Sequence, residues 1–204
     1  MKDKIIFILM LTLCSAITFA QKKHSATPLF KFLKANADST IVMSYESSWG
    51  INPVYFMLSK KGDTINAYTY KIAVVLDQRN VVPHNIQYRL YQNTQALADV
   101  NSNFYINYLS SDSLKNFWKE IVALKPWNIN DDQTDGAGCP VEKDSLQRQI
   151  RDGSTIKLHL ITKKEIKELS FYAPEYYEKQ ICPGRVGRQT ILRIEKLFET
   201  YVQK

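Results

Sequence analysis

Two stretches of this chain alternate apolar and polar residues on both sides of a short polar turn, and this pattern limits the fold more than any other feature. Residues 54–69 alternate around Lys60-Lys61-Gly62-Asp63, and residues 154–172 alternate around Lys163-Lys164. A period of two is typical of a strand that buries one face, and a tight turn between two such strands indicates a hairpin. We therefore expect a mostly antiparallel sheet.

Further strands are predicted with less regular patterns. Residues 40–47 look extended with imperfect alternation, residues 72–76 form an apolar β-type run, and residues 145–151 precede Asp152-Gly153, a strong two-residue hairpin signal. The last of these would make a three-stranded meander with the two strands that follow it. Residues 78–103 have a weak pattern and contain Pro83, so we assign no structure to them.

Three segments have the apolar spacing of amphipathic helices. They are residues 28–36, a segment capped by Asp112 or Ser113 that runs to about Leu124, and residues 188–202. The last of them places Ile191, Ile194, Leu197, Phe198 and Tyr201 on one stripe. Strands followed by covering helices indicate an α+β fold with hairpins, a meander and a C-terminal helix packed on the sheet.

The N-terminus predicts a cleaved secretory signal, residues 1–20. Lys2 and Lys4 precede a largely apolar run at 5–13, and Ala20 is a small residue before the polar Gln21. A membrane-spanning helix needs about 20 apolar residues, and only sixteen residues separate Lys4 from Gln21. Lipoprotein processing at Cys14 is the less favoured alternative because the large Leu13 precedes it. We expect cleavage between Ala20 and Gln21.

The end of this signal reads Phe19-Ala20-Gln21-Lys22. In this style it resembles exported proteins of unknown function of the Bacteroidota type. The resemblance covers the first two dozen residues only. It implies export to the periplasm or the cell exterior, and it carries no information about activity.

The remaining residues, 21–204, are expected to form a single α+β domain without an integral membrane segment. Two halves, 21–125 and 141–204, joined by an acidic, glycine-containing loop at 126–140, are the alternative. The net charge of +7 is spread along the chain. Because nucleic-acid binders concentrate positive charge on one element, we expect a protein, peptide or envelope component as the partner rather than nucleic acid.

Cys139 and Cys182 are each followed by proline and remain after removal of the signal. In an oxidising compartment an isolated cysteine pair favours a disulfide. Such a bond would close a loop of about 44 residues and stabilise the fold by about 4 kcal/mol. A zinc site would need more ligands, and His159 lies at no recognised spacing from the two cysteines.

The segment from Asp131 to Glu142 partly matches a calcium-binding loop. Asp131, Gln133, Asp135 and Glu142 stand at the ligand positions 1, 3, 5 and 12, and Gly136 stands at the turn. Gln133 departs from the pattern, and the segment that follows is predicted as a strand rather than as the second helix of an EF-hand. An ordinary acidic loop is the favoured interpretation; calcium is the one cofactor that the sequence suggests at all.

Three arginines, Arg185, Arg188 and Arg193, lie near the start of the C-terminal helix, with Gly184 and Gly187 around the first of them. A glycine turn that enters a helix can bind an anion through backbone N–H groups and nearby cations. The spacing matches no phosphate-loop motif, so a solvated helix start is the alternative.

The local motifs of hydrolases are absent from the sequence: it contains no G-x-S-x-G and no H-E-x-x-H. Its three histidines are isolated from one another. We therefore assign no catalytic residue and expect a non-enzymatic binding or interaction module of the cell envelope. A small secreted hydrolase with a site assembled from distant residues stays open as the second hypothesis.

Overall fold

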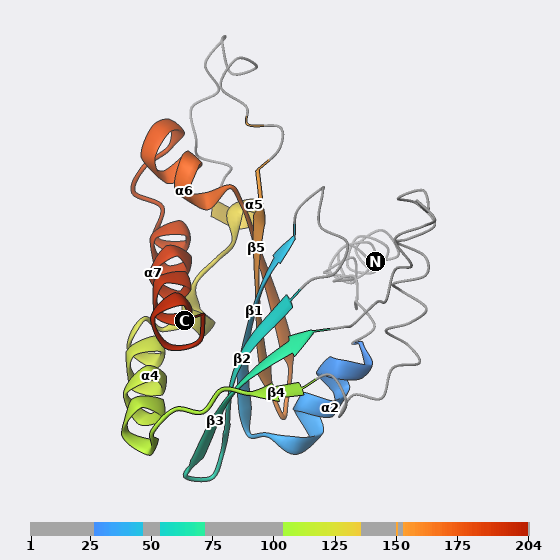
Figure 1. The fold of residues 1–204 in the computed structure, drawn as a ribbon. Coiled ribbons are helices and arrows are strands. Elements are labelled where there is room, and N and C mark those ends of the chain that lie inside the picture. Colours follow the sequence, from blue (N-terminus) through green and yellow to red (C-terminus); the bar gives the residue numbers. More distant parts are fainter. Residues whose placement is uncertain (1–26, 47–53, 72–103, 136–149, 151–152, 204) are drawn as a thin grey trace, which may run out of the picture.

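The protein is built around one six-stranded antiparallel sheet with the strand order β4-β3-β2-β1-β5-β6. The computed structural model describes residues 27–46, 54–71, 104–135, 150 and 153–203 (Figure 1). The strands are β1 (Ser39–Glu46), β2 (Val54–Lys61), β3 (Thr64–Lys71), β4 (Phe104–Ile106), β5 (Thr155–Thr162) and β6 (Ile166–Tyr172). The predicted α+β fold with an antiparallel sheet and hairpins is confirmed.

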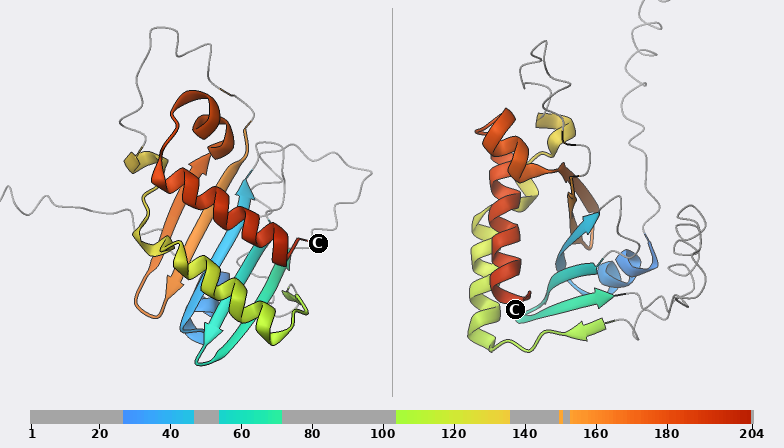
Figure 2. Two further views of the ribbon diagram at one scale, coloured as in Figure 1. Left: turned by 90° about the vertical axis from the view of Figure 1, so that its left-hand side faces the viewer. Right: turned by 45° about the horizontal axis from the view of Figure 1, so that its top comes forward.

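Helices cover both faces of the sheet. The helix α2 (Pro28–Asn36) lies on one face, and α4 (Ser111–Ala123) and α7 (Val186–Tyr201) lie side by side on the other (Figures 1 and 2). Single turns follow at η3 (Pro126–Asn128), α5 (Asp132–Asp135), α6 (Pro174–Tyr176) and the π-type turn η6 (Tyr177–Ile181). None of the helices in the described ranges combines the length and apolarity needed to cross a membrane.

The central strand β1 explains why its sequence alternates poorly. Ile41 and Met43 face the core beneath α4 and α7, whereas Val42 faces the smaller core beneath α2. All three side chains are fully buried. A strand that is covered on both faces has no solvent side that requires polar residues, so period-two patterning is lost.

The pair of helices α4 and α7 is joined by aromatic contacts. Phe117 of α4 meets Phe198 edge-on at 5.1 Å between ring centroids and stacks on Tyr201 at 4.6 Å. The helix α4 begins earlier than predicted because Ser110, and not Asp112 or Ser113, is its N-cap: the Ser110 hydroxyl accepts a hydrogen bond from the backbone N–H of Ser113 at 3.1 Å.

The meander predicted for the second half of the chain is wrong in one respect. The strand β5 has β6 on one side and β1 on the other, so neither of its edges is left for a third strand of that meander. All eight residues of β1 pair with β5. Of the predicted strand, Ile150 is described and is not in a strand; residues 145–149 and the predicted strand at 72–76 lie outside the described residues. The meander that the structure does contain is β1 to β4.

Segments on both sides of residues 126–140 therefore share one sheet and one core. The cluster beneath α4 and α7 includes Met43 and Leu58 from before this segment and Leu158 and Phe198 from after it. The strand pair β1–β5 joins the two parts of the chain directly.

Candidate functional site

The start of α7 is where the sequence placed an anion site, and the structure places a carboxylate of the chain itself there. Glu178, from η6, accepts hydrogen bonds from the backbone N–H groups of Gly184 at 2.7 Å and Arg185 at 3.2 Å, and from the Gln189 side chain at 2.8 Å. Partial burial opposes the charge of Glu178, but these donors outweigh it and lower the pKa of its carboxyl. This side chain supplies the cap that Arg185, the N-cap residue, does not provide.

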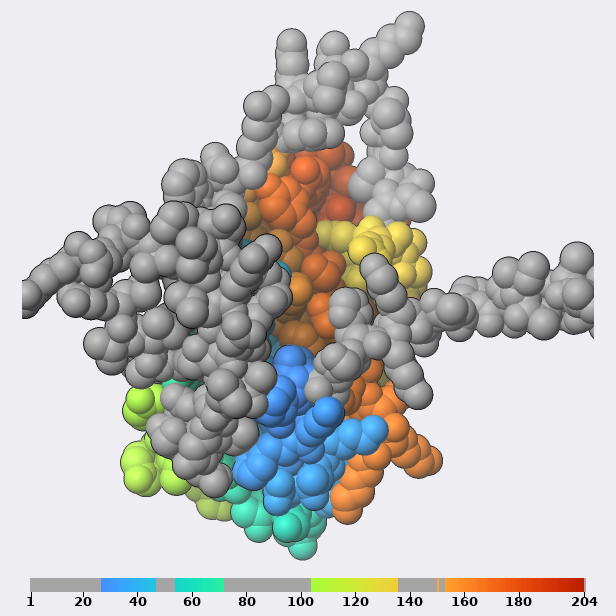
Figure 3. Space-filling view, turned by 90° about the vertical axis from the view of Figure 1, so that its right-hand side faces the viewer, coloured from blue at the N-terminus to red at the C-terminus, as the bar shows by residue number. Residues whose placement is uncertain are grey.

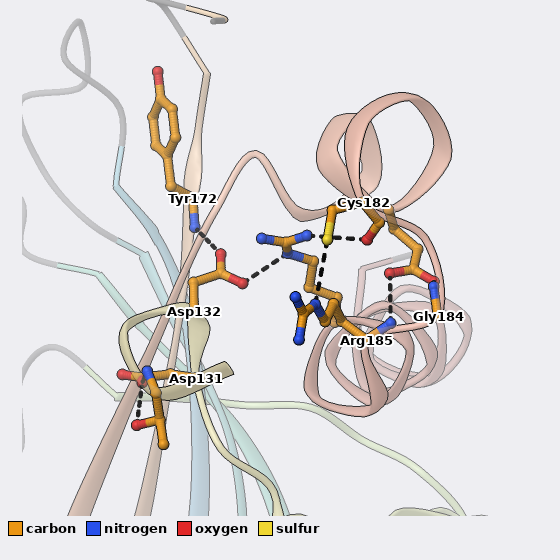
Figure 4. A network of polar contacts seen from close by, with 9 residues as sticks. Asp131, Asp132, Tyr172, Cys182, Gly184 and Arg185 are labelled. Carbon is orange, nitrogen blue, oxygen red and sulfur yellow. Dashed lines mark hydrogen bonds and ion pairs between the residues drawn. The ribbon is translucent and has the colours of Figure 1, made fainter. Parts of the chain in front are cut away.

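Arg188 is buried and held by the chain. Its Nε donates to Asp132 Oδ1 at 2.7 Å, and one of its terminal nitrogens donates to the Cys182 carbonyl at 3.3 Å. Its guanidinium also lies 5.4 Å from the centre of the Tyr177 ring. Figure 4 shows Asp132 between this guanidinium and the backbone N–H of Tyr172, from which it accepts at 3.2 Å. Burial raises the pKa of the Asp132 carboxyl, although Arg188 opposes the shift. The pair connects α5, β6 and α7.

A hollow of about 320 Å³ lies beside the first turn of α7. It is lined by Asn128, Ile129, Asn130, Asp135, Gly184, Arg185, Val186 and Gly187. On one side α7 approaches the chain so closely that a Cβ atom on Gly187 would lie 2.2 Å from the carbonyl oxygen of Asn130. The hollow is thus bordered by a tight backbone contact.

The three predicted anion-binding arginines do not gather at this hollow. Arg185 lines it, with Nε 3.3 Å from the Cys182 sulfur. Arg188 is only 5% exposed and bonded to Asp132, and Arg193 is exposed farther along α7. Their shared role in anion binding therefore has no common pocket in the described part of the chain, and Arg188 serves as an internal cross-link.

The predicted calcium ligands are also engaged within the chain. Asp131 accepts from the backbone N–H of Thr134 at 3.2 Å and so caps α5, and Asp135 accepts from the Asn130 amide at 3.2 Å. Gln133 is exposed, and Glu142 lies outside the described residues. Among the residues that the structure describes, no group of three or more His, Cys, Asp or Glu side chains could hold a metal ion. Calcium binding stays an untested prediction.

Cys182 is buried, with 7% of its surface exposed, next to Arg188 and Arg185 (Figure 4). Its predicted disulfide partner, Cys139, lies outside the described residues. The Cys139–Cys182 bond therefore stays a prediction.

His159, the histidine within the described ranges, lies on β5 beneath α2. Its Nε2 is 3.5 Å from Glu168 Oε2, and its ring centre is 4.4 Å from that of Phe30. Its Nδ1 is buried and has no hydrogen-bond partner among the described residues. His24 and His84 lie outside those residues. Because Phe30 covers His159, the imidazole ring of His159 is not available to a substrate.

The contacts of Glu168 with His159 and Lys157 give a pH-dependent contribution to stability. The hydrogen bond from His159 lowers the pKa of Glu168 to about 2, with help from Lys157 and against the effect of burial. Because the folded pKa lies below the ordinary value of 4.5, this contribution is complete above about pH 4.5 and is lost as the pH falls towards 2.

We expect Glu168→Gln to lower the melting temperature at pH 6 and to have a smaller effect at pH 2.5. The loss at pH 6 should be below about 1 kcal/mol, because the side chain is 37% exposed and water screens its charge. Thermal unfolding from pH 2 to 6 measures it, and Glu165→Gln in the neighbouring turn is the control. Equal losses for Glu168→Gln at both pH values would contradict the assignment.

Sequence analysis missed a set of lysines that the fold brings to one end of the sheet. The turns β2–β3 and β5–β6 lie on either side of the start of β1, because β1 pairs with both β2 and β5. The last turn of α2 adds another lysine at the same end, where α2, the β2–β3 turn and the β5–β6 turn meet at the bottom of Figure 3. We call Lys34, Lys60, Lys61, Lys163 and Lys164 the lysine end.

Asp38 holds the lysine end together. Its carboxylate accepts from the backbone N–H of Gly62 at 2.7 Å and pairs with Lys163 Nζ at 2.6 Å, and its own N–H donates to the Lys60 carbonyl at 2.8 Å. Lys163, and next Gly62, lower the pKa of the Asp38 carboxyl, so that it stays charged. Lys34 Nζ donates to the Lys164 carbonyl at 3.0 Å. Three segments distant in sequence thus form one braced surface.

A signal for this surface was present in the sequence. A Lys-Lys pair stands at each of the two hairpin turns. Only the strand order, with β1 between β2 and β5, shows that the two turns lie at the same end of the sheet.

Comparison with known proteins adds no family to this description: no family model, no curated protein and no solved structure matches the chain.

Proposed function

We propose that this chain is an exported, non-enzymatic binding or interaction module of the cell envelope. The observation that carries the proposal is the lysine end, a positively charged surface that three segments build and Asp38 braces. By contrast, two charged groups near the start of α7 are bonded within the chain: Glu178 to backbone N–H groups and to Gln189, and Arg188 to Asp132. Fixed positive charge on the outside of a fold favours association with an anionic partner.

A small secreted hydrolase is less well supported by the described residues. The register places Ser44 opposite Lys157, and a serine–lysine mechanism would need the lysine as the general base. Burial opposes the charge of Lys157, but Glu46 and Glu168 outweigh it and raise the pKa of its ammonium group. A lysine that stays protonated cannot act as the general base, and His159 lies beneath Phe30.

The export part of the proposal rests on the leader, residues 1–20. Intact-mass measurement of protein purified from its native envelope should give a chain that begins at Gln21. A mass that includes Met1 would contradict export by this route.

Capture experiments with envelope extract test the binding part. Immobilised native protein should retain an envelope component up to a stoichiometric plateau, and the double variant Lys61→Glu/Lys164→Glu should lose at least 80% of it. The double variant Lys115→Glu/Lys119→Glu, on the exposed side of α4, makes the same change in net charge and is the matched control.

Two results would count against a binding module. The first is equal retention by wild type and both double variants, because the lysine end would then have no role. The second is chemical change of the extract component by protein at catalytic amounts, which would favour the hydrolase.

A further inference from the structure

We infer that the lysine end docks the protein on an anionic lipid surface, through the phosphate groups of lipids such as phosphatidylglycerol. The inference deepens the proposed function and depends on it, because a binding module of the envelope encounters such surfaces. The partner is defined by its negative charge and by the planar arrangement of its phosphate groups.

The spacing of the lysines suits a planar array of anionic groups. The Lys60-Lys61 pair ends β2 and the Lys163-Lys164 pair follows β5, with β1 between the two strands. Neighbouring strands lie about 4.8 Å apart, so the two pairs stand about 10 Å apart. The pairs lie at two hairpin turns and do not line the hollow beside α7, whereas a single small ligand is usually held in a concave site.

The composition of the two turns points to lipid phosphates rather than to nucleic acid or to insertion in the bilayer. Residues 60–64 and 162–165 contain only lysine, glycine, threonine, aspartate and glutamate. Proteins that bind single-stranded nucleic acid stack bases on aromatic side chains, and proteins that insert into the bilayer do so with apolar ones. The turns supply neither kind of side chain. The interaction left to them is electrostatic attraction between the lysines and an anionic lipid surface.

The lysine end keeps a net charge of +2, because its five lysines outnumber the three carboxylates of Asp38, Asp63 and Glu165. Within the described residues, no ion pair engages Lys60, Lys61 or Lys164, whereas Lys163 is paired with Asp38. The acidic residues of the two turns are Asp63 and Glu165. The brace at Asp38 fixes the positions of the turns, so little conformational freedom is lost when they meet a surface.

Vesicle sedimentation tests the inference with the purified native chain. At 50 mM salt the protein should bind vesicles that contain 30% phosphatidylglycerol in phosphatidylcholine and should not bind vesicles of phosphatidylcholine alone. Lys61→Glu/Lys164→Glu should lower the partition coefficient at least tenfold. Lys115→Glu/Lys119→Glu, with the same net charge, should lower it less than twofold, and 500 mM salt should release the wild type. Melting temperatures of the variants check that each is folded.

Several results would overturn the docking inference. Equal losses in the two double variants would mean that only the net charge of the protein acts. If the wild type does not bind anionic vesicles but binds single-stranded DNA through the lysine end, the partner is a nucleic acid and not a lipid. Absence of vesicle binding together with lysine-dependent capture of an envelope protein would reject the lipid and leave the proposed binding module intact.

Discussion

Replacement of Arg188 by alanine should destabilise the protein by about 3–5 kcal/mol. Arg188 is 5% exposed, and its guanidinium bonds to Asp132 and to the Cys182 carbonyl. Its removal leaves the partly buried carboxylate of Asp132 with the Tyr172 N–H but without its positive partner. Burial already raises the pKa of Asp132 in the presence of Arg188. Without Arg188 the charged form of this carboxylate would be stabilised still less. Urea denaturation at pH 7 measures the loss.

A double replacement separates loss of the pair from loss of packing. In Arg188→Met/Asp132→Asn no charge is left unpaired, and the asparagine oxygen can still accept from the Tyr172 N–H. We expect this variant to recover at least half of the stability, because a buried ion pair can often be replaced by neutral groups at small cost. Arg193→Ala, exposed on the same helix, should change stability by no more than about 0.5 kcal/mol. An Arg188→Ala effect as small as that of Arg193→Ala would mean that the cross-link is not needed.

Gly187→Ala should also destabilise the protein, by about 2–3 kcal/mol. Elsewhere in a helix interior, alanine in place of glycine usually stabilises by about 0.5–1 kcal/mol. Here the added Cβ would lie 2.2 Å from the Asn130 carbonyl oxygen, a backbone atom. Lys167 Nζ donates to the carbonyls of Trp127 and Ile129 at 2.9 and 2.8 Å, and these bonds hold the same stretch of chain in place. The sign of the effect is therefore reversed.

Hydrogen exchange locates the damage in Gly187→Ala. Amides in the first turn of α7 and at residues 128–130 should exchange faster, and those at the centre of the sheet should change only as far as global stability does. Lys196→Ala, exposed on α7, is the control and should stay within about 0.5 kcal/mol of the wild type. Stabilisation by Gly187→Ala would show that α7 does not approach Asn130 this closely.

Elements whose pattern is local were predicted well. The hairpin of β2 and β3 and the helix α7 lie within a few residues of their predicted bounds, since a short polar turn and an apolar stripe are both set by neighbouring residues. The Asp152-Gly153 signal led to a wrong meander, because a local turn motif does not reveal that β1 takes the other edge of β5.

The candidate sites show the same division. Arg185, Arg188 and Arg193 suggested an anion site because they are close in sequence, but burial divides them: Arg188 pairs with Asp132, which lies 56 positions away. The lysine end is not predictable from local sequence, because its members come from three distant segments, residues 34, 60–61 and 163–164. Proximity in sequence thus suggested a cluster of arginines that the fold separates, and it gave no sign of the lysines that the fold brings together.

The sequence by itself determined the fold class, the β2–β3 and β5–β6 hairpins and the amphipathic helices, because each follows from the chemistry of neighbouring residues. The tertiary structure decided which charges meet, from Glu178 at the start of α7 to the two Lys-Lys turns on either side of Asp38. The physical reason is that pairing between distant strands and burial beneath helices depend on the whole core, whereas a repeating pattern records only the immediate surroundings of each residue.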